Sequence, residues 1–170
     1  DTTAKGNIGL AYTYNEPLIG YEFVYDCAKL IRKNGLKNVL VTNGYICEEP
    51  LIKLLPFIDA MNIDLKAFTD AFYKKISGDL DTVKRTIELS AKTCHVEVTT
   101  LIIPGENDSE EEIASLSEWL SSISDEIPLH ISRFFPRYQY LDRQPTSVEK
   151  VYRLAEVARR NLKYVYTGNC

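Results

Sequence analysis

The chain alternates short apolar runs with longer segments of helical periodicity, and this alternation leaves few possible folds. Apolar and β-branched runs recur between segments whose apolar residues fall three or four positions apart. The expected strands cover residues 8–14, 37–42, 59–66, 95–103, 129–134 and 164–166. The expected helices cover residues 18–34, 48–55, 69–76, 79–92, 109–122 and 147–161. Strands alternating with helices of this length predict right-handed βαβ units around a parallel sheet, an α/β fold.

Local signals mark several of the expected helix ends. Asn15 is expected to cap the first helix, with Pro17 in its first turn. Ser109 followed by Glu112 predicts a capping box, in which each residue bonds the other's backbone. Ser147 is expected to cap the last helix.

Polar residues occupy every second position in three of the expected strands. The sets are Asn62, Asp64 and Lys66; His95, Glu97 and Thr99; and His130 and Ser132. Because successive side chains of a strand point to opposite faces, each set shares one face. Unpaired charges are costly to bury, so these faces predict a wet, ligand-filled interior. We therefore expect a partial (βα) TIM-like barrel of parallel strands. An Asp64–Lys66 ion pair and ordinary core or rim histidines are structural alternatives.

Composition narrows the class of protein further. A length of 170 residues with 45% hydrophobic content predicts a single domain over residues 1–170. A net charge of −4 and the lack of a long apolar run argue against nucleic-acid and membrane partners. The four cysteines have no CxxC spacing, which favours reduced thiols in a cytoplasmic protein. The first residue is Asp1 and the only methionine is Met61, so we expect a piece of a longer protein.

Residues 15–17, Asn-Glu-Pro, form the corner between the first expected strand and the first expected helix. In parallel α/β folds such strand-to-helix corners face the ligand crevice, which makes Glu16 a candidate binding carboxylate. The alternative is that Glu16 only complements the helix dipole.

Five segments at expected strand ends together resemble the radical S-adenosylmethionine (SAM) superfamily. They are residues 12–17 (YTYNEP), 41–45 (VTNGY), 62–66 (NIDLK), 103–105 (IPG) and 132–136 (SRFFP). The set is most similar to the pyruvate formate-lyase activating enzymes and their AmmeMemoRadiSam-type relatives, and it covers almost the whole chain. The resemblance implies an enzyme that reductively cleaves SAM at a [4Fe–4S] cluster to a 5′-deoxyadenosyl radical. It implies a glycyl radical enzyme, or another protein substrate, as the partner.

The resemblance also implies roles for individual residues. Asn15 and Glu16 match the family's GGE-type segment, which hydrogen-bonds the amino group of SAM. Thr42 and Asn43 match the TNG segment that lines the same pocket. A zwitterionic amino-acid group needs an acceptor for its ammonium and a donor for its carboxylate, and both bonds are charge-assisted.

Two further positions complete the implied site. Lys66 matches a lysine that pairs with the methionyl carboxylate of SAM. Asp64 matches a carboxylate associated with a monovalent cation in activating enzymes. Those enzymes usually carry an aspartate before TNG, where this chain has Val41, which puts the cation site in doubt.

The family's CxxxCxxC loop, which ligates the cluster, is absent from the sequence. We therefore expect a radical SAM core that lacks its first βα unit, with no metal ligands of its own and no activity alone. Two alternatives remain open. One is a (βα)-barrel lyase or aldolase that uses Lys66 as a Schiff-base nucleophile. The other is a cluster-free module that binds an adenosyl ligand or a partner.

Overall fold

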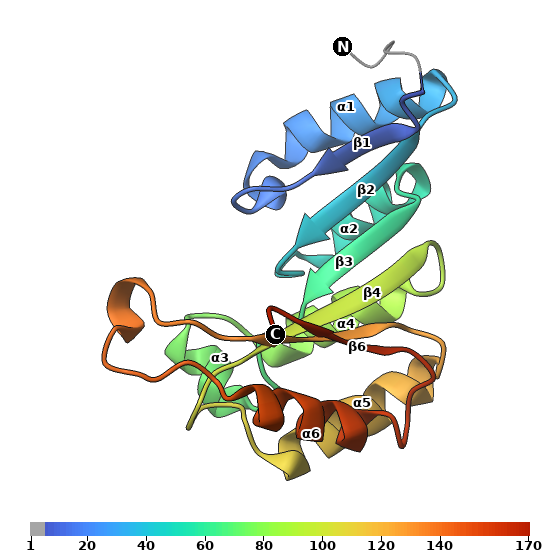
Figure 1. Cartoon of the computed structure of the whole chain (residues 1–170). Coiled ribbons are helices and arrows are strands. Elements are labelled where there is room, and N and C mark those ends of the chain that lie inside the picture. Colours follow the sequence, from blue (N-terminus) through green and yellow to red (C-terminus); the bar gives the residue numbers. More distant parts are fainter. Residues whose placement is uncertain (1–5) are drawn as a thin grey trace. The chain divides into compact units, whose positions relative to one another are not determined.

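The computed structural model describes residues 6–170 and confirms the α/β class. Six parallel strands, in the order β1-β2-β3-β4-β5-β6, alternate with helices along the chain (Figure 1). The residues divide into two compact units, one running up to Asp64 and including Asp81–Val96, the other made of Leu65–Leu80 and Glu97–Cys170. Within residues 6–170, none of the helices is long and apolar enough to cross a membrane.

The first unit is built around three parallel strands. Its elements are β1 (Gly9–Tyr12), η1 (Pro17–Gly20), α1 (Tyr21–Lys33), β2 (Lys37–Thr42), α2 (Glu48–Leu54), η2 (Leu55–Phe57), β3 (Ala60–Asp64) and α4 (Leu80–Ser90), whose first residue belongs to the second unit. Gly9 lies opposite Lys37, and Val39 lies opposite Ala60. Helix α1 runs alongside β1 and β2 (Figure 1).

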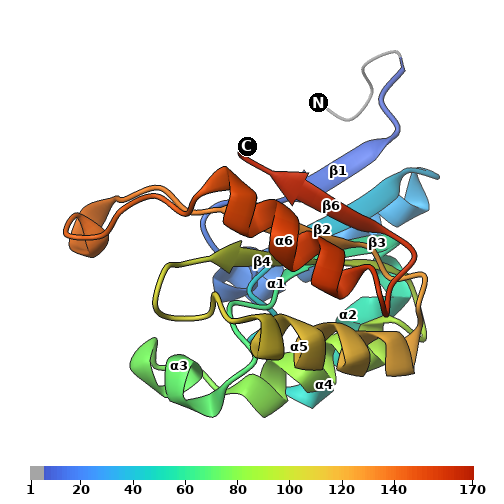
Figure 2. The same cartoon turned by 60° about the horizontal axis from the view of Figure 1, so that its bottom comes forward.

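The second unit repeats the pattern. Its elements are α3 (Asp70–Lys75), β4 (His95–Ile102), which begins in the first unit, α5 (Glu110–Ile123), β5 (Leu129–Arg133), η3 (Tyr138–Tyr140), α6 (Val148–Ala158) and β6 (Val165–Gly168). Val98 lies opposite Leu129, which in turn lies opposite Val165. Helices α5 and α6 lie side by side, and α6 packs on β5 and β6 (Figure 2).

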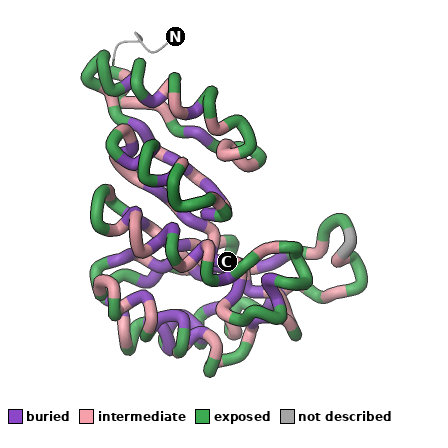
Figure 3. Tube along the Cα trace, turned by 180° about the vertical axis from the view of Figure 1, so that it is seen from behind, coloured by how far each residue is buried: buried purple, intermediate pink, exposed green. Residues whose placement is uncertain are grey.

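Burial alternates along the strands as the polar pattern predicts. In β4 every second residue from Val96 to Ile102 is buried, whereas the residues between them are half-buried. Buried and less buried positions also alternate along other parts of the chain trace (Figure 3). Strand β3 buries Met61 and Ile63 and leaves Asn62 and Asp64 half-buried. In β3 and in most of β4, the less buried side of the strand therefore carries the polar residues of the sequence pattern.

A buried asparagine ties the first unit together. Asn38 is fully buried, and its Nδ2 donates to the carbonyls of Ala28 and Phe57, each at 2.9 Å. Its Oδ1 accepts from Tyr12 Oη at 2.9 Å, and its backbone N donates to Asp59 Oδ2. A single side chain thus joins β1, α1 and η2 with every polar group paired.

The structure corrects three local expectations. Asn15 does not cap the first helix; Glu16 caps η1, and its carboxylate accepts from Leu18 N. The capping box is half formed: Ser109 Oγ accepts from Glu112 N, but the Glu112 carboxylate accepts from Phe68 N instead.

The third correction concerns the strand expected over residues 59–66. Strand β3 ends at Asp64, which leaves Lys66 in the following loop. The physical reason is that Lys66 N donates to the side chain of Tyr73 and not to a neighbouring strand.

Candidate functional site

The carboxylate of Glu16 is held at the carboxyl end of β2. Oε1 accepts from Leu18 N at 3.1 Å and from Thr42 Oγ1 at 2.6 Å. Oε2 accepts from Asn43 N at 2.7 Å. The Asn-Glu-Pro corner and the TNG segment, which lie 26 residues apart, therefore meet at one side chain, as the sequence suggested. We call residues 15, 16, 42 and 43 the Glu16 corner.

Glu16 keeps one acceptor position for a ligand. A carboxylate offers about four lone-pair sites, and the three bonds above use two on Oε1 and one on Oε2. Within residues 6–170, the structure gives Glu16 Oε2 one hydrogen bond, and the residue is half-buried. A fixed carboxylate with one vacant acceptor position suits a ligand ammonium group.

Thr42 and Asn43 differ in what they offer a ligand. Thr42 is 3% exposed, and its hydroxyl both donates to Glu16 and accepts from Gly44 N at 3.1 Å, so it positions Glu16. Asn43 Oδ1 accepts from Tyr45 N at 2.8 Å, which leaves its amide Nδ2 as a donor for a ligand.

The turn after Asn43 requires a glycine. Gly44 has a φ of +70°, in the region that L side chains rarely adopt. A Cβ built there would lie 2.8 Å from Ile63 Cγ2. The Gly44 carbonyl accepts from Thr86 Oγ1 at 2.7 Å, which ties the turn to α4.

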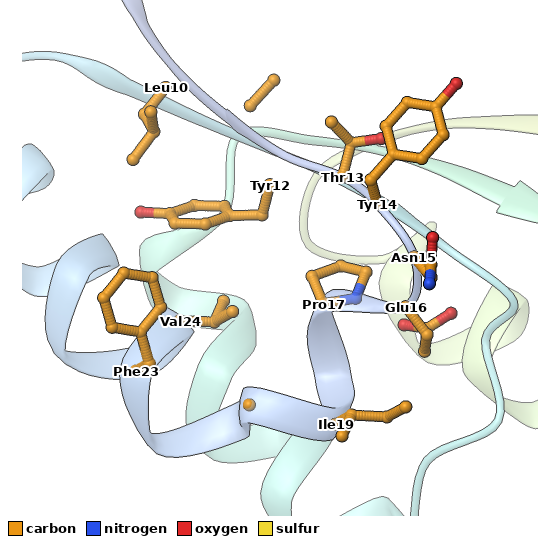
Figure 4. Close-up of a pocket in the computed structure, with 12 residues that line it drawn as sticks. Leu10, Tyr12, Thr13, Tyr14, Asn15, Glu16, Pro17, Ile19, Phe23 and Val24 are labelled. Carbon is orange, nitrogen blue, oxygen red and sulfur yellow. The ribbon is translucent and has the colours of Figure 1, made fainter.

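A pocket of about 560 Å³ opens beside the Glu16 corner (Figure 4). Its walls come from β1, η1 and α1. Asn15 and Glu16 lie at one end, and apolar side chains that include Leu10, Phe23 and Val24 lie at the other (Figure 4). The volume lies within the range of small-molecule pockets.

The last two predicted site residues lie at and beyond the end of β3. Thr42 lies opposite Ile63, so Asp64 ends its strand at the same edge of the sheet as the Glu16 corner. Lys66 belongs to the second unit, where its backbone N donates to Tyr73 Oη and its carbonyl accepts from Asn107 Nδ2. The convergence of Lys66 with Glu16 stays a prediction.

The cysteines present do not fit an iron–sulfur cluster. Cys27 lies within α1, and Cys47 is exposed just before α2. Burial, with a smaller contribution from the nearby Asp59 charge, raises the pKa of Cys94 to about 11, which disfavours the thiolate that iron requires. Among the residues described, no three His, Cys, Asp or Glu side chains are grouped to hold a metal ion.

The sequence did not predict the contact between Glu97 and His130, which lie on neighbouring strands of the second unit. His130 Nε2 lies 2.8 Å from Glu97 Oε2, and the His130 ring stacks on Tyr166 with ring centroids 5.4 Å apart. The period-two pattern placed Glu97 and His130 on polar strand faces, but only the register of β4, β5 and β6 makes them neighbours.

Comparison with known proteins identifies the class. Residues 3–117 match the family model described as the radical SAM superfamily, and the chain belongs to that superfamily.

Two relatives show how much of this chain is similar to individual proteins. An uncharacterized protein of Methanocaldococcus jannaschii is 45% identical over 165 residues, covering 95% of this chain and 49% of that protein. The pyruvate formate-lyase 1-activating enzyme of Escherichia coli (strain K12) is 28% identical over 117 residues, covering 65% of this chain and 47% of that enzyme. The chain thus spans about half the length of these curated relatives.

The solved structure is a domain of a pyruvate-formate lyase-activating enzyme from Bacteroides vulgatus. It matches with a TM-score of 0.78 at 20% identity, covering 95% of this chain and 99% of that chain. The match confirms the expected partial barrel fold of parallel strands.

Proposed function

We propose that the complete protein is a radical SAM enzyme that reductively cleaves SAM with a [4Fe–4S] cluster. The resulting 5′-deoxyadenosyl radical would then abstract a hydrogen atom from a protein partner, as in a glycyl-radical activating enzyme. Membership of the superfamily supports the first statement, and the similarity to an activating enzyme supports the second.

The fixed carboxylate of Glu16 carries the proposal. Its three internal hydrogen bonds orient it and leave one acceptor position, which fits the ammonium group of SAM. Because the carboxylate is already oriented, a ligand that binds it loses little additional ordering entropy. Asn43 Nδ2 supplies a neighbouring donor, and Asn15 lies at the rim of the adjoining pocket (Figure 4).

Lys66 completes the proposed binding of the amino-acid end of SAM. Its ammonium would pair with the methionyl carboxylate, so that Glu16 and Lys66 supply opposite charges to a zwitterion. Asp64 would lie near the same end of SAM. A lyase that uses Lys66 as a nucleophile would leave the Glu16 corner without a role.

The cluster ligands would come from outside these 170 residues, because the four cysteines do not fit them. We propose that a strand–helix unit of the complete protein pairs with the outer edge of β1. Large apolar side chains flank that edge with high exposure: Ile8 is 82% exposed, Ile19 86% and Phe23 71%. A neighbouring strand and helix would cover these side chains and carry the cysteine loop.

The test is SAM affinity in the complete, cluster-containing protein, measured by isothermal titration calorimetry. Glu16→Gln and Lys66→Met should each weaken binding about 10- to 100-fold, which corresponds to one charge-assisted hydrogen bond of about 1.5–3 kcal/mol. The iron content should not change, since neither residue is a proposed ligand. Glu22→Gln, which alters an exposed carboxylate on α1, is the matched control and should leave the affinity unchanged.

Unchanged SAM affinity in both site variants, with any loss confined to stability, would contradict the proposed site. The proposed role as a glycyl-radical activating enzyme is tested by a separate measurement. The complete protein, reduced and supplied with SAM, should generate the electron paramagnetic resonance doublet of a glycyl radical in its partner. Formation of 5′-deoxyadenosine without that signal would leave the SAM cleavage intact and contradict the activating role.

A further inference from the structure

The loop that carries Lys66 is fastened by side chains from three other parts of the second unit. We call residues 65–68 the Lys66 loop. Tyr73 Oη, on α3, accepts from Lys66 N at 3.1 Å. Asn107 Nδ2 donates to the Lys66 carbonyl at 2.8 Å. Glu112 Oε1, on α5, accepts from Phe68 N at 2.6 Å.

These contacts lie in a part of the second unit that is shielded from solvent. Tyr73 is 3% exposed and Asn107 is 1% exposed. Leu65 and Ala67, on either side of Lys66, are 0% and 2% exposed and anchor the loop in the core. Lys66 itself is half-buried, so a fixed backbone presents one partly accessible side chain.

Asn107 connects the loop to the end of β4. Its Oδ1 accepts from Ile103 N at 2.7 Å, and its Nδ2 also donates to the Leu101 carbonyl at 2.9 Å. The amide thus uses both donors and its acceptor on backbone groups of three residues. A fully paired buried amide of this kind fixes one arrangement of the chain.

An ion pair joins helix α3 to Glu106, the residue before Asn107. Lys75 Nζ lies 2.5 Å from Glu106 Oε1, and Glu106 is only 12% exposed and also pairs with Arg143. Because Lys75 lies two residues from Tyr73, the pair fixes the helix that supplies the Tyr73 hydroxyl.

We infer that Tyr73 and Asn107 are positioning residues that hold Lys66 ready to bind the carboxylate of an amino-acid ligand. The inference rests on the proposed function, in which that ligand is the methionyl end of SAM. A lysine side chain has high rotamer entropy, so a carboxylate gains affinity when the backbone that carries the lysine is already fixed. The two residues act through Lys66 and do not touch the ligand.

A double-mutant cycle tests the inference in the complete protein, with SAM as the titrant. Tyr73→Phe removes only the hydroxyl, and we expect it to weaken SAM binding about 3- to 10-fold, the effect of one hydrogen bond. Tyr73→Phe combined with Lys66→Met should bind no more weakly than Lys66→Met alone, because the hydroxyl acts through the lysine. Asn107→Asp keeps the acceptor for Ile103 N but loses both donors and places a buried carboxyl group against two carbonyls, so it should weaken SAM binding more than Tyr73→Phe does.

The matched control is Tyr21→Phe, which removes a hydroxyl that donates to the Pro50 carbonyl at 2.9 Å in the first unit. It should lower stability comparably and leave SAM affinity unchanged. The amide of Lys66 should also exchange with solvent faster in Tyr73→Phe than in Tyr21→Phe.

Other outcomes would contradict either the positioning role of Tyr73 and Asn107 or the proposed role of Lys66. If Lys66→Met weakens binding while Tyr73→Phe and Asn107→Asp do not, the proposed function stands and the positioning role is wrong. Additive losses in the cycle would also overturn it. If Lys66→Met has no effect, the proposed role of Lys66 fails, and the positioning role fails with it.

Discussion

At the scale of single residues, the surroundings of Cys94 predict an unreactive thiol. Burial, followed by the nearby Asp59 charge, raises its pKa to about 11. At pH 8 its thiolate fraction is on the order of 100-fold below that of an ordinary cysteine, and alkylation requires the thiolate. We expect iodoacetamide to label the exposed Cys47 rapidly and Cys94 at least 100-fold more slowly. Mass spectrometry of digests would measure this, and similar rates at both sites would contradict the burial argument.

Glu112 makes a pH-dependent prediction. Burial raises the pKa of its carboxyl, the nearby Asp108 charge adds to this, and the hydrogen bond from Phe68 N offsets part of it. A raised pKa means that the folded chain holds the proton more tightly than the unfolded chain does. The contribution to the free energy of unfolding is therefore complete below the ordinary glutamate pKa, about 4.3, and is lost as pH rises through the raised pKa.

Glu112→Gln should abolish that decline, because the amide oxygen still accepts from Phe68 N and carries no charge to desolvate. Urea unfolding of the 170-residue chain at several pH values above 4 would measure the effect. Glu111→Gln, at an exposed neighbouring position, is the control and should keep the pH dependence of the parent chain. A parallel pH dependence in Glu112→Gln would contradict the assignment.

At the scale of elements, Asn38 connects β1, α1 and η2 of the first unit through buried hydrogen bonds. Asn38→Ala removes the partners of the Ala28 and Phe57 carbonyls and of the Tyr12 hydroxyl. Each buried group left unpaired costs about 1–3 kcal/mol, so we expect the free energy of unfolding to fall by about 3–5 kcal/mol.

The control is Asn34→Ala at the end of α1, where an exposed amide donates to the Leu30 carbonyl. Water can replace that bond, so this variant should lose less than about 1 kcal/mol. Denaturant titration compares the two, and equal losses would show that Asn38 is not the buried connection described above.

Local periodicity was enough to predict the elements but not all of their ends. Repeated apolar spacing recovered every strand and helix of the alternation, because burial of one face drives both patterns. Glu16 and not Asn15 caps η1, because Glu16 is oriented by Thr42, 26 residues away. Strand β3 stops early because a tyrosine hydroxyl replaces a strand partner at Lys66. Local sequence patterns do not predict tertiary hydrogen bonds of this kind, which replace the expected local ones.

The sequence likewise predicted only some residues of the candidate site. Glu16, Thr42 and Asn43 were predicted because their motif lies at strand ends, and the structure brings them together, while their role in binding stays a prediction. The residues that fasten the Lys66 loop were missed because Tyr73 and Asn107 have no motif of their own. Their proposed role depends on which backbone groups lie opposite them in the fold.

At the scale of the whole molecule, the strand order leaves β1 at an edge of the sheet. An edge strand presents unpaired backbone donors and acceptors that invite pairing with another chain. Around this edge lie the exposed side chains of Ile8, Tyr14, Ile19 and Phe23. Exposed apolar side chains beside an unpaired edge favour association in water.

We therefore expect the 170-residue chain to self-associate through the β1 edge and the exposed residues of η1 and α1. Phe23→Lys places a charge on that surface and should shift the chain toward the monomer in sedimentation velocity at high micromolar concentration. Tyr152→Lys, at a 49% exposed aromatic residue on α6, is the matched control and should leave the association unchanged. A monomeric parent chain, or an equal response to the two substitutions, would show that the β1 edge does not drive association. In the complete protein, the proposed strand–helix unit would cover the edge, so Phe23→Lys should lower its stability without changing its oligomeric state.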